Sequence, residues 1–86
     1  MSTITPALER PSTEAAEDWL VQRFASLAQV APAEIDLDRP FADYRLDSAV
    51  AVTISGEFSR WLGQELPITL FWEHPTIRSL AFAVTH

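Results

Sequence analysis

The chain has 86 residues, which is enough for one domain around a single small core. It contains no cysteine, so disulfides, thiolate catalysis and cysteine metal sites are excluded. The formal net charge of −6 argues against nucleic-acid or anionic-membrane partners. It either suits partners with basic surfaces or only keeps a small domain in solution. No apolar run is long enough to cross a bilayer and no secretory signal opens the chain, so we expect a cytoplasmic protein.

Residues 1–12 are predicted to be a flexible arm, and residues 13–86 the folded domain. A first helix should begin after Pro11 with Ser12 or Thr13 as its cap. It should end near Val30, because Pro32 disfavours helical backbone at the residue before it. Its core-facing residues recur at helical spacing and are Ala16, Leu20, Phe24 and Leu27, with Trp19 beside them.

Residues 33–47 form a long, acid-rich connection to the next helix. A connection of this length needs packing of its own to stay ordered. Its apolar residues are therefore expected to anchor it to the core; they are Ile35, Leu37, Phe41 and Leu46.

The second helix is predicted over residues 48–62, with Asp47 as its N-cap and Gly63 as its left-handed stop. The residues expected on its buried side are Ala51, Ile54, Phe58 and Leu62. Next to them runs a strip of small, uncharged residues: Ser48, Ala49, Val52, Thr53 and Gly56. This strip is either a surface that another protein approaches closely or an ordinary solvent-facing side.

A short helix over residues 70–72 should end before Pro75, and Thr76 should cap the last helix. The buried residues expected in that helix are Ile77, Leu80, Ala81 and Val84. No strand-like alternation of any length occurs. The sequence therefore predicts an all-α fold, a small bundle of three main helices plus one short helix.

Ser48 is the candidate for chemistry, because it would lie in the first turn of a helix. The free N–H groups and the dipole of that turn attract a phosphate. The alternative is that Asp47-Ser48 is only a good helix start. Hydrolase chemistry is disfavoured because His74 and His86 are distant in sequence and no Gly-x-Ser-x-Gly elbow surrounds the serine. No metal-ligand spacing and no phosphate-binding glycine loop occurs.

The stretch Phe41-Ala42-Asp43-Tyr44-Arg45-Leu46-Asp47-Ser48 resembles the acyl carrier protein signature, phe-x-x-tyr/leu-gly-leu-asp-ser-leu. Residues 62–67, followed by 70–77 with their Pro-Thr-Ile ending, resemble the matching tail of polyketide-synthase carrier domains. The resemblance covers about residues 13 to 86. It implies a right-handed bundle with a long loop between the first two main helices.

The resemblance also implies a function. Ser48 would receive 4′-phosphopantetheine from coenzyme A through a phosphopantetheinyl transferase, with Asp47 as helix cap and recognition residue. The arm would supply the reactive thiol that the chain lacks. The domain would catalyse nothing. As a monomer, it would present thioesters to a ketosynthase, to an acyltransferase or acyl-activating ligase, and to other tailoring enzymes. The implied docking residues are Arg45, Leu46, Ala49, Val52, Thr53, Gly56 and Trp72.

The sequence departs from the family pattern in three places. Arg45 stands where the signature has Gly, and Ala49 stands where it has Leu. The second helix carries one acid, Glu57, against Arg60, whereas fatty-acid-synthase carriers are acidic there. Docking should therefore depend more on shape and apolar contact than on charge.

Three alternatives to a polyketide-type carrier stay open at this point. The first is a peptidyl carrier of a nonribosomal peptide synthetase, although such carriers have gly-gly-x-ser where this chain has Asp47 before Ser48. The second is a helical docking or adaptor domain without a prosthetic group, and the third is a small hydrolase using Ser48. The sequence does not decide between a discrete carrier and a piece of a larger synthase.

Overall fold

The computed structural model describes residues 11–44 and 46–86, so most of the predicted N-terminal arm and Arg45 lie outside the described residues. Four α-helices follow one another: α1 (Thr13–Ala28), α2 (Ser48–Leu62), α3 (Leu70–Glu73) and α4 (Ile77–Thr85). Two short 3-10 helices, η2 (Pro32–Glu34) and η3 (Phe41–Tyr44), lie between α1 and α2. The described residues contain one isolated β-bridge, Pro40 to Thr76, and no strand. The predicted all-α class is confirmed.

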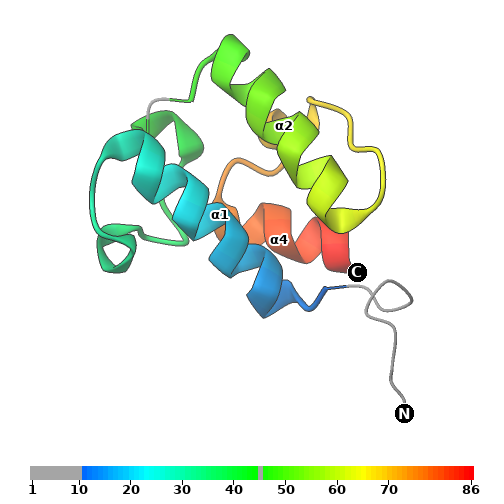
Figure 1. Ribbon diagram of the computed structural model, residues 1–86, viewed down its shortest axis with the longest axis horizontal. Helices are drawn as coiled ribbons and strands as arrows, with labels where there is room; N and C mark the ends of the chain where they lie inside the picture. The colour runs from blue at the N-terminus through cyan, green and yellow to red at the C-terminus, as the bar shows by residue number, and fades with distance from the viewer. Residues whose placement is uncertain (1–10, 45) are drawn as a thin grey trace.

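The helices pack as a small bundle in which α1 and α2 run in roughly opposite directions (Figure 1). α4 packs closely against α1. The end of the chain lies beside the start of α1, where the hydroxyl oxygens of Thr13 and Thr85 are 2.6 Å apart. The beginning of α2 lies at the opposite end of the molecule from the C-terminus (Figure 1).

The core consists of apolar side chains from every α-helix and from the connection between α1 and α2. Phe24, Phe58, Leu20, Ile77 and Leu80 are completely buried. The predicted buried residues of α4 are all in the core. Leu27 and Leu62 are exceptions to the prediction for α1 and α2. They are half-buried and pack against the core from its edge, because each lies in the last turn of its helix.

The ends of α1 are set by local capping. Ser12 is the N-cap, and its hydroxyl accepts a hydrogen bond from the Ala15 N–H at 3.0 Å. The helix ends at Ala28, two residues before the predicted end at Val30. Gln29 adopts a left-handed conformation with φ of 60°, which turns the chain so that the N–H of Val30 donates to the Ala25 carbonyl at 3.0 Å.

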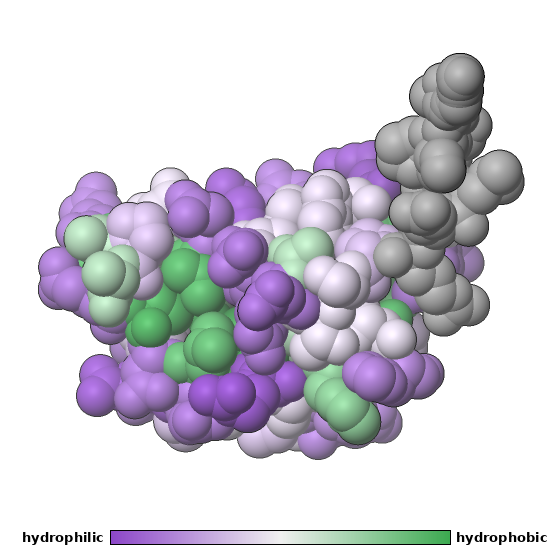
Figure 2. Space-filling model, turned by 90° about the horizontal axis from the view of Figure 1, so that it is seen from below, coloured by the Kyte–Doolittle hydropathy of each residue, from purple (hydrophilic) through white to green (hydrophobic). Residues whose placement is uncertain are grey.

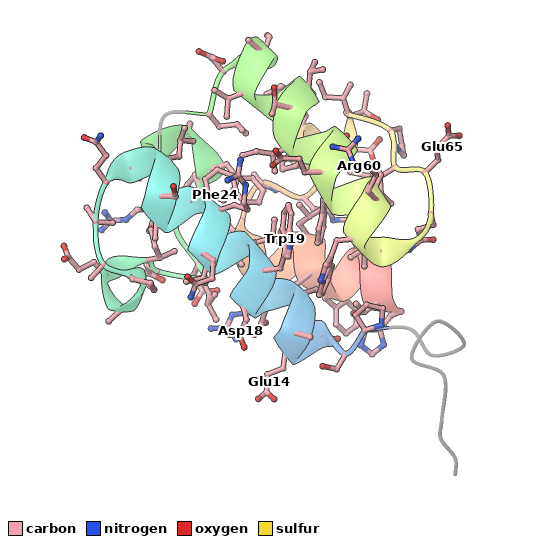
Figure 3. All side chains as sticks on the ribbon, viewed as in Figure 1. Glu14, Asp18, Trp19, Phe24, Arg60 and Glu65 are labelled. Carbon is pink, nitrogen blue, oxygen red and sulfur yellow. The ribbon has the colours of Figure 1, made fainter. Side chains whose placement is uncertain are left out.

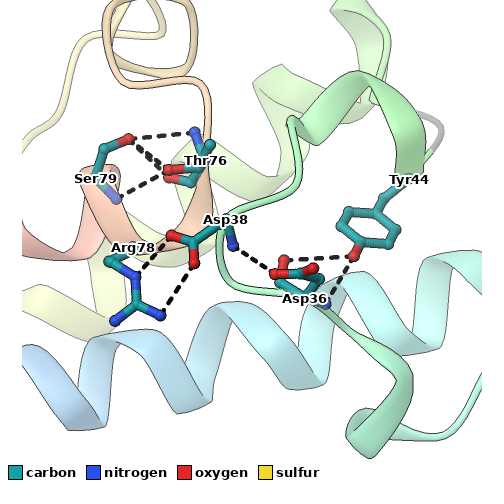
Figure 4. A network of polar contacts seen from close by, with 6 residues as sticks. All are labelled: Asp36, Asp38, Tyr44, Thr76, Arg78 and Ser79. Carbon is teal, nitrogen blue, oxygen red and sulfur yellow. Dashed lines mark hydrogen bonds and ion pairs between the residues drawn. The ribbon is translucent and has the colours of Figure 1, made fainter.

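Aromatic residues tie the connection to the core. The Phe41 ring stacks on Phe24 with centroids 4.8 Å apart and contacts Phe71 at 5.3 Å. Tyr44 is not among the predicted anchors, yet it is buried, and its hydroxyl accepts a hydrogen bond from the Asp36 N–H at 2.8 Å (Figure 4). Of the four predicted anchors, Ile35 and Phe41 are buried, while Leu37 and Leu46 are half-buried.

A polar contact joins the same connection to α4. The Arg78 guanidinium binds both carboxylate oxygens of Asp38, at 2.7 and 3.2 Å (Figure 4). The Arg78 N–H also donates to the Leu37 carbonyl. The Arg78 guanidinium, through its hydrogen bonds and its charge, lowers the pKa of Asp38 below its ordinary value. The start of α4 therefore holds the middle of the connection in place.

The surface is largely polar. Seen from below, hydrophilic side chains surround a smaller hydrophobic area (Figure 2). Glu14 and Asp18 point away from the bundle, whereas Trp19 points from α1 toward α2 (Figure 3). Over residues 11–44 and 46–86, no helix is long and apolar enough to span a membrane.

Candidate functional site

Ser48 is the first residue of α2, and its side chain is exposed. Asp47 before it has an extended backbone and acts as the N-cap, as predicted. The Asp47 carboxylate accepts a hydrogen bond from the Val50 N–H at 2.9 Å, and its carbonyl accepts from the Ala51 N–H at 2.8 Å. These two bonds fix the first turn of the helix and hold Ser48 at its tip.

This setting fits a phosphodiester on the Ser48 hydroxyl. The first N–H groups of a helix have no partner within the helix, and here the side chain of Asp47 satisfies only that of Val50. Together with the helix dipole, the N–H groups of Ser48 and Ala49 favour a nearby anion. Because Ser48 is exposed, a group attached to it displaces no core residue.

The predicted docking residues differ in how much they expose. Val52 is 61% exposed and Trp72 is 53% exposed. Ala49 and Thr53 are also exposed, whereas Leu46 is half-buried and packs against the core. These residues come from the segment before α2, from α2 itself and from α3.

Gly56 leaves the middle of α2 open. A Cβ atom added there would meet only the end of the Arg60 side chain, at 4.0 Å. The absence of a side chain at this position is therefore not required by packing inside the domain. Arg45, the remaining predicted docking residue, lies outside the described residues.

Comparisons with known proteins identify the family of the chain. A family profile described as "Phosphopantetheine attachment site" matches residues 18–84. The chain belongs to this family of carrier proteins. The prosthetic group of this family is phosphopantetheine.

The carrier is also similar to individual proteins of known type. It is 41% identical over 63 residues to one of the proteins that make up the phenolphthiocerol/phthiocerol polyketide synthase of Mycobacterium tuberculosis, covering 73% of this chain and 3% of that protein. Among solved structures it resembles Asl1650, an acyl carrier protein from Anabaena sp. PCC 7120 with a variant phosphopantetheinylation-site sequence. The TM-score is 0.81 and the identity 38%, over 99% of this chain and 92% of that one.

A second solved structure is a free-standing peptidyl carrier protein from Acinetobacter baumannii. Its TM-score is 0.77 and its identity 34%, over 85% of this chain and 91% of that one. The carrier described here therefore has structural relatives in both acyl and peptidyl systems.

His86 of the carrier lies away from Ser48. His86 ends the chain, far from the start of α2 (Figure 1). Its ring stacks on Phe82 with centroids 4.0 Å apart, and its Nε2 is 3.1 Å from the Thr13 hydroxyl. Within the described part of the chain, no group of three potential metal ligands comes together.

Sequence reasoning missed two contacts between α1 and α2. Trp19 stacks on Phe58 and Trp61, with centroids 4.8 and 5.9 Å apart, so Trp61 is a packing residue at the rim of the core. Arg23 and Glu57 form an ion pair of 2.8 Å between α1 and α2. Neither pairing follows a local spacing rule, so the sequence carried no signal for them.

Proposed function

We propose that the carrier holds biosynthetic intermediates as thioesters on a 4′-phosphopantetheine arm attached to Ser48. It presents them to partner enzymes of polyketide-type assembly. We assign the carrier domain to residues 13–86; most of the predicted N-terminal arm, residues 1–12, lies outside the described residues. The observation that carries the proposal is an exposed serine at the first position of a capped helix, in a chain whose family is defined by phosphopantetheine attachment.

The arm explains how a chain without cysteine handles thioesters. The prosthetic group supplies the thiol, and the tether raises the local concentration of the intermediate at each partner's active site. The chain itself would catalyse nothing, in keeping with a family that is generally non-catalytic. The phosphodiester would rest against the N–H groups at the start of α2.

The departures at Arg45 and Ala49 do not weigh against this proposal. The structural relative from Anabaena also has a variant sequence at its attachment site. Asp47 would act both as the helix cap and as a recognition residue for a phosphopantetheinyl transferase.

We expect the partners to be that transferase, a ketosynthase, an acyltransferase or acyl-activating ligase, and tailoring enzymes. They would dock on the segment before α2, on the exposed strip of α2 and on Trp72. The polyketide synthase relative supports this set, although the chain spans only 3% of its length. That the carrier is a monomer stays a prediction. A cytoplasmic location also stays a prediction, and it fits a prosthetic group that is taken from coenzyme A.

A peptidyl carrier is the second candidate, favoured by the 34% identity to the Acinetobacter protein. In that case the arm would hold an aminoacyl group. The acidic residue before Ser48 favours the acyl carrier.

The test begins with the purified apo protein, coenzyme A and a phosphopantetheinyl transferase of broad specificity. Intact mass spectrometry should show the gain of one arm, and Ser48→Ala should stay unmodified. An unmodified wild-type chain would instead support a helical adaptor. A second experiment offers the armed protein malonyl-coenzyme A with an acyltransferase, or an amino acid with an adenylating enzyme. Preferential loading with the amino acid would favour the peptidyl alternative.

A further inference from the structure

A small apolar pocket of about 180 Å³ lies between η3, in the segment before α2, and α3. The residues that line it are Pro40, Phe41 and Ala42 on one side, and Phe71, Trp72 and Pro75 on the other. This volume is below the range of small-molecule sites, about 300–1,000 Å³, and corresponds to the space of about six water molecules. The pocket therefore suits a single apolar side chain.

We propose that this pocket receives one apolar side chain of a partner enzyme, and that basic residues flank that side chain on the partner's surface. The inference rests on the proposed function, because it concerns how a partner docks on the segment before α2 and on Trp72. It adds the chemistry that the partner's surface must have.

The first argument is that the pocket is preformed. Phe41 and Phe71 are each only 2% exposed, and their ring centroids are 5.3 Å apart. The Phe41 N–H donates to the Pro75 carbonyl at 2.8 Å, and Pro40 forms a β-bridge with Thr76. These contacts hold the two sides of the pocket together, so a docking side chain does not have to order them at its own cost.

The second argument is the apolar surface at the edge of the pocket. Phe41 and Tyr44 are both buried and lie one turn apart in η3, so Ala42 between them is exposed. In the single turn of α3, Phe71 is buried and Trp72 is 53% exposed. Exposed apolar surface around a pocket is typical of interaction sites, and tryptophan contributes strongly to binding in such places.

The third argument is charge. Asp43 follows Ala42 in η3, Glu73 follows Trp72 in α3, and both acidic residues are exposed. Arg39 lies 3.9 Å from Asp43, but more than half of each side chain is exposed, so this pair is weak. Each side of the pocket therefore carries a carboxylate that a basic residue of a partner can complement, whereas an acidic partner would be repelled.

The pocket also lies within reach of the attachment residue. Ala42 is six residues before Ser48 in the chain, and six residues span at most about 22 Å. This distance is less than the diameter of a small domain, about 30 Å. A single partner can therefore fill the pocket and receive the arm at the same time.

The first test titrates the unmodified protein with three blocked tripeptides, acetyl-Arg-Leu-Arg-amide, acetyl-Arg-Ala-Arg-amide and acetyl-Glu-Leu-Glu-amide. NMR follows the indole N–H of Trp72, assigned from its loss in Trp72→Phe, and the backbone N–H of Ala42. We expect the Arg-Leu-Arg peptide to shift both signals. The Arg-Ala-Arg peptide should bind about tenfold more weakly because it buries less apolar surface. The Glu-Leu-Glu peptide should bind at least about threefold more weakly because its charges are reversed.

This titration needs no arm, so it is independent of the proposed attachment at Ser48. Equal binding of the Glu-Leu-Glu and Arg-Leu-Arg peptides would overturn the charge argument and with it the proposal. The absence of any shift at Trp72 and Ala42 with the Arg-Leu-Arg peptide would overturn it as well.

The second test uses the armed protein and an acyltransferase that charges it from malonyl-coenzyme A. Ala42→Leu fills the pocket and should raise the KM for the carrier at least about threefold, with kcat and Tm unchanged. Ala33→Leu is the matched control, since Ala33 is exposed in η2 and does not line the pocket. The double variant Asp43→Asn with Glu73→Gln should also raise KM, whereas Glu34→Gln, which removes an exposed acid in η2, should not.

Equal KM values for Ala42→Leu and Ala33→Leu would overturn the pocket while leaving attachment intact. A chain that accepts no arm would instead overturn the proposed function, and with it the docking of a partner enzyme.

Discussion

Replacing Asp47 separates its two proposed roles, helix cap and recognition residue. In Asp47→Ala, the Val50 N–H loses the carboxylate oxygen that lies 2.9 Å away. Loss of such a cap costs about 0.5–2 kcal/mol of the free energy of unfolding. Loss of the negative charge from the helix start adds roughly 0.3–1 kcal/mol. Since a domain of this size is stable by roughly 4–13 kcal/mol, the total of about 1–3 kcal/mol is a substantial fraction.

Asp47→Asn is the control that keeps the cap and removes the charge. Asn caps helices about as well as Asp, so this variant should lose only the charge effect, roughly 0.3–1 kcal/mol. Urea denaturation followed by circular dichroism measures both variants. Each kcal/mol corresponds to about 4–8 °C in Tm for a domain of this length.

The rate of arm attachment is then measured on the folded fraction of each variant. If the carboxylate is recognised by the transferase, attachment should be slow in both variants, although the asparagine keeps most of the stability. Rapid attachment in Asp47→Asn would show that Asp47 acts on the transferase only through the helix start. Equal stability of the alanine variant and wild type would refute the capping argument.

Three further outcomes follow from the structure. Phe41→Ala should cost about 3–5 kcal/mol in urea denaturation because its ring is buried between other aromatic rings, whereas truncation of the half-exposed Trp72 should cost far less; equal losses would contradict the assigned anchoring role. Gly56→Arg should slow acyl transfer from a partner enzyme and leave Tm nearly unchanged, since a Cβ there meets only the end of the Arg60 side chain, at 4.0 Å; a parallel loss of stability would mean a packing role. The lowered pKa of Asp38 predicts that its pairing with Arg78 stabilises the fold above the ordinary carboxyl pKa of 3.8 and that this contribution is lost as the pH falls through the lower folded-state pKa. Asp38→Asn should remove that part of the acid dependence, and an unchanged pH profile of unfolding would contradict it.

Local signals explain why the site could be predicted from the sequence. The N-cap at Asp47 and the stop at Gly63 depend on backbone geometry within a few residues. They fixed both ends of α2 and with them the position of Ser48. The function was predicted from the residues around Ser48 together with residues 62–67 and 70–77, because the serine alone is compatible with an ordinary helix start.

Features that depend on distant residues could not be predicted in this way. The burial of Tyr44 requires its hydroxyl to meet the backbone of Asp36, which happens only when the connection folds back on itself. The two 3-10 helices lie in that same segment, and each is too short to show a helical periodicity of apolar residues in the sequence. The open groove that Arg23 and Leu27 of α1 and Val50 of α2 line likewise depends on how the two helices pack, which no spacing along one helix encodes.

Locating the arm on the chain is the decisive experiment for the proposed function. After attachment from coenzyme A, trypsin cleavage at the arginines releases residues 46–60, a peptide with four hydroxyl-bearing residues: Ser48, Thr53, Ser55 and Ser59. Fragmentation of that peptide in a mass spectrometer assigns the added phosphopantetheine to one of them. We expect all of it to be on Ser48. Attachment to another hydroxyl, or none on this peptide, would contradict the proposed function.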